Sequence, residues 1–438
     1  MSNFAFDTLK VRAGYQPKEH NNAVSVPIYQ TTAYTLGDSY RADRLFAFEE
    51  ADPIYTRLSN PTVDVLEKRV AELHGAAGAI GLASGMAAVT YALLNAAGKG
   101  GRILTSVRLY GGTVDSFDQI FEDFDIGIDI VENPDDLSEF EAKFTPDTRA
   151  VFLETLTNPF GTIPDLEEIA KIAHSRGAVL IVDNTVATPY LLNPFEFGAD
   201  VVVYSATKAL NGHGNVIAGL VVESGKFDYA KGKHPQFTKP LWLLRDANDN
   251  KRSILDIFPD LPFTGRIRAI YLNYLGAALG PFDAWLTLLG VETLSERVRT
   301  QVENARKIRQ YLETCPHVAW LRHPETDDSP YRGLAAKYFP KGAGSIVSFG
   351  FKGTEEARRT FLASTEIFSY QANIGDARSL IINPAQTTHV ELTGRQRELT
   401  NLTPDTIRLS LGLEDANDLI ADLKQAFERA YAGKDGKL

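Results

Sequence analysis

The chain has 438 residues, of which 44% are hydrophobic and 23% are charged, a composition that is typical of folded globular proteins and excludes collagen and wholly disordered chains. Its formal net charge is -11, so its overall electrostatic field repels nucleic acids and anionic membranes, and we expect neither as a partner. The single cysteine, Cys315, excludes an internal disulfide and a cysteine-rich secreted scaffold.

Residues 1–16 contain no basic segment followed by an apolar run, and no stretch of the chain has the length of a membrane span. We therefore expect a cytoplasmic protein. The single thiol and the absence of a cluster of cysteine and histidine at zinc-ligand spacing favour a reducing compartment and chemistry that does not use a thiol, and we expect no metal site. At roughly 150 residues per domain, a chain of this length accommodates two or three domains.

Residues 1–59 are polar and rich in turn formers, and they show no sustained periodicity, so we expect an N-terminal arm. The first clear helix begins at Asn60 and Pro61, a capping residue followed by proline at the first helical position. This helix should end at Gly75. Its apolar face consists of Val63, Leu66, Val70 and Leu73.

A large domain is expected over residues 60–280, because apolar runs of strand length alternate with helical patterns up to residue 222. Several runs are apolar throughout, as strands buried on both faces are. The alternation predicts an α/β fold with a mostly parallel sheet covered by helices. The expected strands are 79–82, 102–106, 126–131, 150–153, 178–183, 200–204 and 217–222, and a further helix is expected over 166–177.

Segment 225–265 has no regular pattern and is long enough to form a functional or interface loop inserted in the large domain. A C-terminal domain is expected over 281–438, where helical periodicity returns, most clearly in the amphipathic stretch 294–313. This domain should also contain a strand at 345–351 and helices at 354–363 and 415–432.

The most informative string is YSATKALNGHGN at 204–215, which begins where an expected strand ends. A lysine at the carboxyl end of a strand, here Lys208, lies over the crevice where open α/β sheets bind ligands, and a buried amine can form a Schiff base. The hydroxyls of Ser205 and Thr207 flank Lys208 and are suited to hold a phosphate. Taken alone, the string is also typical of a surface lysine that follows a strand. The choice between a surface lysine and a Schiff-base lysine therefore depends on the other motifs.

Asp183 ends the expected strand 178–183 and is followed by NTVATPY. A carboxylate at the end of a buried strand is costly unless it meets a cation, and a protonated pyridine nitrogen is such a cation. The alternative is an aspartate whose side chain caps the next turn.

A glycine-bearing turn, ASGMAA, follows the expected strand 79–82 and opens into a helix. The backbone N–H groups of Ser84, Gly85 and Met86 would then lie at the positive end of the helix dipole, where a phosphate binds. Close packing of small residues is the alternative explanation of this string.

Four further strings carry side chains suited to ligand binding. In the arm, Tyr55 and Arg57 precede the first helix, and an arginine fork matches a phosphate. Tyr110 follows strand 102–106 and is suited to stack on a flat ring. Asn158 follows strand 150–153, and Arg408 in IRLSLGLE is suited to clamp a carboxylate. Each of these also has a reading as a turn residue or a solvated charge.

Together and in this order, the strings resemble the Cys/Met metabolism family of pyridoxal phosphate (PLP) enzymes, of aspartate aminotransferase fold. The resemblance covers nearly the whole chain and implies a fold type I PLP-dependent transferase. Within the family, the chain is most similar to the O-acetylhomoserine sulfhydrylase branch, through VESGKFDY, PFDAWLTLLGVETL, PKGAGSIVSFG and NIGDARSL. The strings shared with the family as a whole are YTRLSNPTVDVLEKR, LASGMAA, LYGGT, ETLTNP, IVDNTVATPY, YSATK, NIGDARSLIINPAQTTH and IRLSLGLE.

The resemblance implies a role for each matching residue. Lys208 would carry the cofactor and move protons, Asp183 would pair with the pyridine nitrogen, and Tyr110 would stack on the ring. Tyr55 and Arg57 would reach the site of a neighbouring subunit and bind the cofactor there. The catalytic residues would be Lys208, Tyr110 and Tyr55. The phosphate would be bound by Ser84, Gly85, Met86, Ser205 and Thr207. Asn158 would donate to the cofactor's phenolic oxygen, and Asn158, Ser379 and Arg408 would orient the substrate, with Arg408 on its α-carboxylate.

The implied reaction is γ-replacement on O-acetyl-L-homoserine, in which sulfide or methanethiol displaces acetate to give homocysteine or methionine. A shared site requires at least a dimer, and the family suggests a homotetramer. Asn383 and Gln386 stand where the family commonly reads histidine and serine, and Ala206 replaces a frequent leucine. These departures leave open the preference between acetyl and succinyl substrates and the sulfur donor.

Three alternatives remain at this point. A cystathionine γ-synthase or γ-lyase, or a methionine γ-lyase, would use the same cofactor residues, although Gly112 stands where methionine γ-lyases carry a cysteine. A serine hydrolase is a remote alternative, with Ser205 and Lys208 as its S-x-x-K motif. A non-catalytic binding protein leaves the combination of Lys208, Asp183 and Arg408 unexplained.

Overall fold

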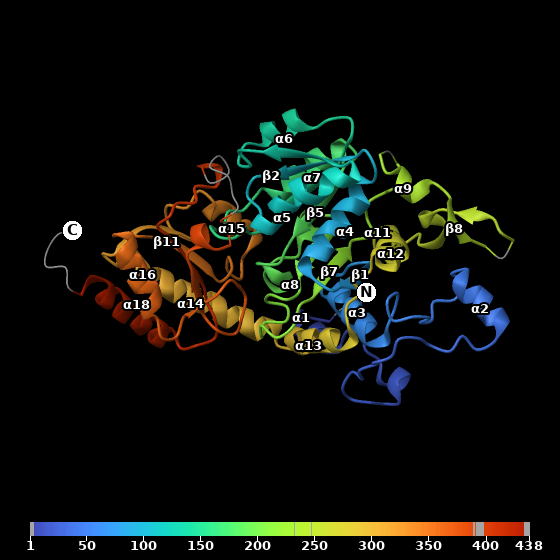
Figure 1. Ribbon diagram of the computed structural model, residues 1–438, viewed down its shortest axis with the longest axis horizontal. Coiled ribbons are helices and arrows are strands. Elements are labelled where there is room, and N and C mark those ends of the chain that lie inside the picture. Colours follow the sequence, from blue (N-terminus) through green and yellow to red (C-terminus); the bar gives the residue numbers. More distant parts are fainter. Residues whose placement is uncertain (1–3, 232, 247, 389, 391–397, 433–438) are drawn as a thin grey trace.

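The computed structural model describes residues 4–231, 233–246, 248–388, 390 and 398–432. Two sheets organise the chain: a large α/β domain at the centre and a smaller C-terminal domain beside it (Figure 1). The long helix α14 (Leu294–Glu313) runs from the centre of the molecule into the smaller domain (Figure 1). The predicted α/β class with two sheet domains is confirmed.

The central sheet has seven strands in the order β1-β7-β6-β5-β4-β2-β3. Only β7 runs antiparallel to its neighbours among the described strands, so the sheet is mostly parallel, as predicted. The carboxyl ends of the parallel strands therefore meet at one edge. The bounds are β1 (Gly78–Leu82), β2 (Arg102–Ser106), β3 (Gly127–Val131), β4 (Thr148–Glu154), β5 (Val179–Asp183), β6 (Val201–Ser205) and β7 (Gly219–Glu223).

Helices cover both faces of this sheet, and strand β5 shows why its sequence is apolar throughout. Leu180 and Val182 belong to one hydrophobic cluster, with Leu66 of α3 (Pro61–His74) and Ile169 of α7 (Leu166–Ser175). The alternate residues of β5 belong to a second cluster, on the face covered by α4 (Gly85–Ala97). Burial on both faces leaves no polar side to the strand.

Helix α3 begins and ends as the sequence indicates. Asn60 caps its N-terminus by accepting a hydrogen bond from the Thr62 N–H, and Pro61 occupies the first helical position. Gly75 ends the helix with a φ of 60°, a left-handed conformation that glycine adopts without strain.

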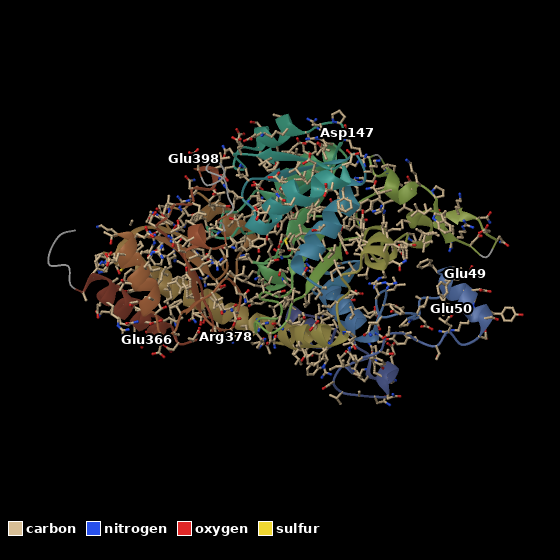
Figure 2. All side chains as sticks on the ribbon, viewed as in Figure 1. Glu49, Glu50, Asp147, Glu366, Arg378 and Glu398 are labelled. Atoms are coloured by element: carbon tan, nitrogen blue, oxygen red, sulfur yellow. The ribbon has the colours of Figure 1, made fainter. Side chains whose placement is uncertain are left out.

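The N-terminal arm is less irregular than expected. It contains α1 (Phe6–Arg12), which packs against α3, and α2 (Ser39–Phe46), which projects away from the large domain (Figure 1). Glu49 and Glu50 follow α2 and lie on this projection (Figure 2). Helix α2 has only eight residues, too few for its amphipathic pattern to be recognised as a helical period in the sequence.

Segment 225–265 also has more structure than the expected irregular loop. It folds into α9 (Pro235–Thr238), a hairpin of β8 (Leu241–Arg245) and β9 (Lys251–Arg252), α10 (Ile254–Ile257) and α11 (Pro262–Arg266). The hairpin projects on the same side of the molecule as α2 (Figure 1).

The C-terminal part begins with α13 (Pro281–Glu292), which packs on α3 of the large domain, and continues into α14. Its sheet has the order β10-β11-β14-β13-β12. The division at residue 281 stays a prediction. The bounds are β10 (Val318–Arg322), β11 (Ile346–Phe351), β12 (Ser369–Tyr370), β13 (Leu380–Ile382), β14 (Thr406–Ser410), α15 (Arg332–Tyr338), α16 (Glu355–Ser364) and α18 (Ala416–Tyr431).

Short helical segments complete the described chain. They are Pro17–His20, Gly111–Ser116 (α5), Phe117–Phe121, Glu122–Phe124, Leu137–Lys143 (α6), Thr188–Leu191 (α8), Pro194–Phe197, Ile267–Leu272, Asn273–Leu275 (α12) and Pro384–Gln386. No helix within the described ranges combines the length and the apolar character that a bilayer crossing needs. The cytoplasmic location stays a prediction.

Candidate active site

A cavity of about 320 Å³ lies at the carboxyl edge of the large sheet and is closed on its other side by residues of the C-terminal part. The large sheet contributes the ends of β1, β4, β5 and β6, as expected for a ligand site in an open α/β sheet. Most of the predicted site residues line it, namely Ser84, Gly85, Met86, Tyr110, Asn158, Asp183, Ser205, Thr207, Lys208 and Arg408.

Lys208 follows β6, and its side chain is half-buried in this cavity. Its Nζ donates a hydrogen bond to Oδ1 of Asn373 over 2.6 Å. Burial, together with the positive charge of Arg408, lowers the pKa of the Lys208 amine to about 8. A larger fraction of this amine is therefore neutral near pH 7 than for an exposed lysine, which suits it to nucleophilic and proton-transfer chemistry.

Arg408 lies on β14 of the C-terminal sheet, and its side chain is only 2% exposed. Its guanidinium donates to Oδ1 of Asn158 over 3.1 Å and to the backbone oxygen of Asn373 over 2.8 Å. Its Nε has no hydrogen-bond partner, and no carboxylate of the described residues pairs with it. Burial lowers the pKa of Arg408 to about 10. An unpaired buried guanidinium facing a cavity is suited to bind a carboxylate.

Asp183 and Glu154 are neighbours across β5 and β4, and both line the cavity. Burial raises the pKa of Asp183 to about 6, while burial and the negative charge of Asp183 raise the pKa of Glu154 to about 8. Within the described part of the chain, neither carboxyl group forms an ion pair. A cationic group of a ligand placed beside Asp183 would therefore offset the cost of burying this charge.

A narrow cradle lies between β6 and the N-terminus of α4. Ser84 caps α4 by accepting a hydrogen bond from the Ala87 N–H. A Cβ at Gly85 would lie 2.5 Å from the Ser205 Cβ, so only glycine permits this approach. The cavity thus has backbone N–H groups at a helix N-terminus next to the Ser205 and Thr207 side chains, an arrangement that binds phosphate.

Tyr110 stands at the mouth of the cavity with its side chain 44% exposed. Its backbone is held in place, because the Tyr110 N–H donates a hydrogen bond to Oε1 of Glu154 over 2.5 Å. A Cβ at Gly112 would lie 2.7 Å from the Tyr110 ring, so a cysteine at this position requires the ring to move. The exposed ring is available to stack on a planar ligand.

The remaining predicted site residues do not line the cavity. Ser379 is fully buried and donates its hydroxyl to Oε2 of Glu414 over 2.7 Å, and its substrate role stays a prediction. Tyr55 and Arg57 lie exposed on the arm, with the Arg57 guanidinium 5.1 Å from the centre of the Tyr55 ring. Within one chain, therefore, these two arm residues have no contact with the site.

Glu154, Asn373 and Thr185 also line the cavity, and none of them is among the residues predicted from the sequence. Thr185 accepts a hydrogen bond from the Ser205 N–H over 2.8 Å and so fixes the start of the turn that leads to Lys208. The signal for Glu154 was available, since it ends a buried strand just as Asp183 does. Asn373 is the first residue of the family string NIGDARSL, but nothing in that string indicates that its side chain contacts Lys208.

These residues fit PLP on observations of the described chain. The cradle at Gly85 accepts a phosphate, the carboxylate of Asp183 lacks a cation, and the Lys208 amine lies in the same cavity. Tyr110 provides a ring at the open side. The donor set matches the three parts of the cofactor: phosphate, pyridine nitrogen and aldehyde.

Comparisons with known proteins agree with this fit. The O-acetyl-L-homoserine sulfhydrylase 1 of Thermus thermophilus is 40% identical over 422 residues, covering 96% of this chain and 99% of its own length. A putative O-acetylhomoserine (thiol)-lyase of Campylobacter jejuni, solved with a pyridoxyl-lysine monophosphate, superposes with a TM-score of 0.92 at 39% identity, over 97% of this chain and all of that one.

A cystathionine γ-lyase of Lactobacillus plantarum, solved with L-serine, superposes with a TM-score of 0.83 at 29% identity, over 98% of this chain and 99% of that one. The model of the Cys/Met metabolism PLP-dependent enzyme family matches residues 7–428. From the geometry of the cavity and from these matches, the chain belongs to the Cys/Met metabolism family of PLP-dependent enzymes.

Proposed function

We propose that the chain catalyses γ-replacement on O-acetyl-L-homoserine, in which sulfide or methanethiol displaces acetate to give homocysteine or methionine. The relatives that are named O-acetylhomoserine sulfhydrylase or homocysteine synthase, at 38 to 40% identity over nearly the full chain, support this substrate. The geometry supports the same class of substrate, an α-amino acid, independently of these names.

The observation that carries the proposal is the link between Lys208 and Arg408 through Asn373. The side-chain oxygen of Asn373 accepts from Lys208 over 2.6 Å, and its backbone oxygen accepts from Arg408 over 2.8 Å. One residue thus sets the spacing between an amine that moves protons and a guanidinium that binds a carboxylate. An α-amino acid held by its carboxylate on Arg408 has its Cα beside Lys208.

The roles of the side chains follow from their positions. PLP, when bound, supplies the electron sink that stabilises negative charge at the substrate carbons. Arg408 binds the α-carboxylate, and Asn158 holds the guanidinium in place through its Oδ1. Lys208 removes the proton at Cα and is positioned to move the proton at Cβ that must leave before acetate departs from Cγ. Tyr110 covers the open side of the cavity.

A γ-elimination activity is the second candidate, because the structural likeness extends to a cystathionine γ-lyase. Gly112 argues against a methionine γ-lyase, because methionine γ-lyases carry a cysteine at this position. The S-x-x-K hydrolase has no support in the geometry of the described residues: Lys208 donates to Asn373 and not to Ser205.

Product analysis tests the proposal. Purified protein with PLP and O-acetyl-L-homoserine is expected to form homocysteine and acetate in equal amounts when sulfide is present, and no homocysteine without it. If 2-oxobutyrate is the main product in both mixtures, the enzyme is a γ-lyase and the proposed replacement reaction is wrong.

We further propose that two copies of the chain share each active site. The exposed position of Tyr55 and Arg57 on the N-terminal arm supports this, because neither residue lines the cavity of its own chain. A phosphate in the cradle would otherwise meet few cationic side chains, and Arg57 supplies one. The homotetramer stays an expectation from the family resemblance.

Mixing two inactive variants tests this sharing. Arg57→Ala and Lys208→Ala are each expected to be inactive, whereas randomly mixed dimers regain about one quarter of the wild-type activity, because half of the dimers carry one intact site. The measurement is the activity of the co-expressed variants, with each variant alone as the control. Absence of any regain would show that Arg57 acts within its own chain or not at all.

The pKa of Lys208 sets the pH dependence of cofactor loading. A neutral amine attacks the PLP aldehyde, so the rate of loading should rise with pH and level off above about 8, far below the pH at which an exposed lysine is neutral. Stopped-flow absorbance of the apoenzyme mixed with PLP measures it. Because the Arg408 charge lowers this pKa, Arg408→Gln should shift the midpoint to higher pH. A rate that still rises steeply above pH 9 in the wild type would contradict the assignment.

A further inference from the structure

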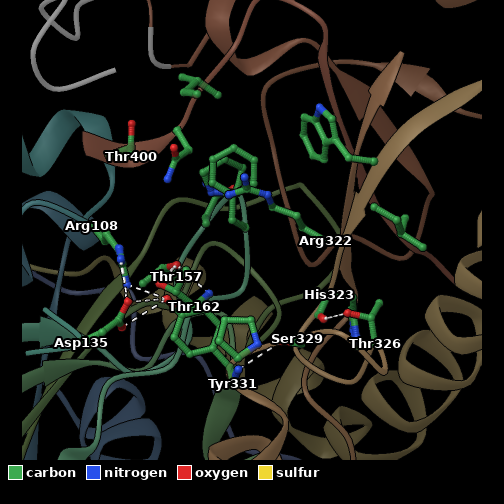
Figure 3. Close-up of a pocket in the computed structure, with 18 of the residues that line it drawn as sticks. Arg108, Asp135, Thr157, Thr162, Arg322, His323, Thr326, Ser329, Tyr331 and Thr400 are labelled. Carbon is green, nitrogen blue, oxygen red and sulfur yellow. Dashed lines mark hydrogen bonds and ion pairs between the residues drawn. The ribbon is translucent and has the colours of Figure 1, made fainter. Parts of the chain in front are cut away.

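A second cavity, of about 460 Å³, lies beside the active site, between loops of the large domain and the C-terminal part. Its walls come from the segments around Arg108, Asp135 and 157–162 of the large domain, and from those around 320–331 and 400–402 of the C-terminal part (Figure 3). Asn158 lines both cavities. The volume falls within the range of small-molecule sites.

Two arginines line this second cavity, and they differ in their partners. Arg108 donates to both carboxylate oxygens of Asp135 over 2.8 Å and to the Tyr331 hydroxyl over 2.7 Å, as the dashed lines in Figure 3 show. Arg322 forms no hydrogen bond or ion pair with any residue that the structure describes. The charge of Arg108 is therefore compensated by Asp135, whereas no described carboxylate pairs with Arg322.

The side chain of Arg322 is nevertheless held in place. Its guanidinium carbon lies 4.8 Å from the centre of the Phe160 ring and 5.2 Å from that of Trp320. Contact with two aromatic rings orders the arginine without using any of its N–H donors. Arg322 thus presents at the wall of the cavity an ordered guanidinium that has no hydrogen-bond partner among the described residues, next to the Phe160 and Trp320 rings, whose centres lie 6.0 Å apart.

We propose that this second cavity binds a small organic carboxylate, which pairs with the guanidinium of Arg322 and packs its apolar part against Phe160, Trp320 and Leu402. A carboxylate supplies the two acceptors that the fork lacks. The aromatic side chains favour a ligand with a flat or apolar body over an inorganic anion. This site is separate from the carboxylate site at Arg408, although Asn158 borders both.

Phenylacetate is a suitable probe, because it combines a carboxylate with an aromatic body, and phenylacetamide is its uncharged counterpart. Isothermal titration of the PLP-loaded enzyme is expected to show saturable binding of phenylacetate and at least roughly tenfold weaker binding of phenylacetamide. Binding should persist at saturating O-acetyl-L-homoserine, which occupies Arg408. Because it measures binding, this test is independent of the proposed reaction.

Variants assign the binding to Arg322. Arg322→Gln should weaken phenylacetate at least roughly tenfold, and Arg322→Lys should weaken it less, since it keeps the charge and loses the fork. Arg359→Gln is the matched control, because Arg359 is exposed on α16 and paired with Glu355, and it should bind as the wild type does. Unchanged melting temperatures would show that the variants are folded.

Three results would overturn the proposal. If phenylacetate binds Arg322→Gln as tightly as it binds the wild type, its carboxylate does not pair with the Arg322 guanidinium. Competition by O-acetyl-L-homoserine would place the carboxylate on Arg408, and the second cavity would then be no separate site. Absence of saturable binding to the wild type would show that the cavity does not take this class of ligand.

Discussion

Replacing Lys208 by alanine is expected to lower kcat/KM for homocysteine formation by about ten thousand-fold, because the variant loses both the amine that binds the cofactor and the group that moves protons at Cα and Cβ. The loss should appear in kcat, since Arg408 still binds the substrate carboxylate. Borohydride reduction should attach a phosphopyridoxyl group to the peptide with Lys208 in the wild type and to no peptide of the variant.

The matched control is Lys171→Ala. Lys171 is exposed on α7, where it pairs with Glu168 over 2.7 Å, and its loss should leave activity and reduction unchanged. A Lys208→Ala variant with more than about one tenth of the wild-type kcat would mean that proton transfer at Cα uses another group.

Replacing Asp183 by asparagine is expected to lower kcat roughly a thousand-fold, while the protein still binds PLP and turns yellow. A neutral amide does not stabilise the protonated pyridine nitrogen as the negative charge of Asp183 does. The loss of one partner of a buried, hydrogen-bonded charge pair costs about 2–5 kcal/mol of interaction free energy. Steady-state kinetics of PLP-loaded protein give kcat, and the visible spectrum reports cofactor binding.

Glu154→Gln is the comparison that isolates this effect. The raised pKa of Glu154, about 8, keeps its carboxyl group mostly protonated at pH 7, so an amide is a close substitute. We expect a loss of less than about tenfold, from the loss of one of the two hydrogen bonds that Glu154 accepts from the backbone N–H groups of Tyr110 and Asn158, because an amide NH2 group cannot accept one. If Glu154→Gln were as damaging as Asp183→Asn, the charge of Asp183 would not be the reason for its importance.

Much of the large domain could be predicted because its signals are local. The cap at Asn60, the proline at Pro61 and the glycine at Gly75 enclose α3, and apolar runs mark the strands to within a residue or two at most ends. Asp183 and Lys208 could be assigned to one edge because parallel strands share the direction in which they end.

The residues that were missed depend on contacts between distant parts of the chain. Asn373 reaches Lys208 only because a loop of the C-terminal part closes over the sheet edge, and no spacing in the sequence shows this. The position of Ser379 in the family string does not show that its hydroxyl turns to Glu414. Helix α1 has no side-chain cap and is stabilised by packing on α3, so local propensity does not reveal it.

The most direct test of the account is to run the reaction in D₂O with sulfide and to locate deuterium in the homocysteine by mass spectrometry. Proton removal by Lys208 at Cα and loss of a proton at Cβ predict deuterium at both carbons, since each is reprotonated from exchangeable sites. Homocysteine without deuterium at either carbon would mean that sulfide displaces acetate directly at Cγ, which would contradict the roles assigned to Lys208, Asp183 and the cofactor site.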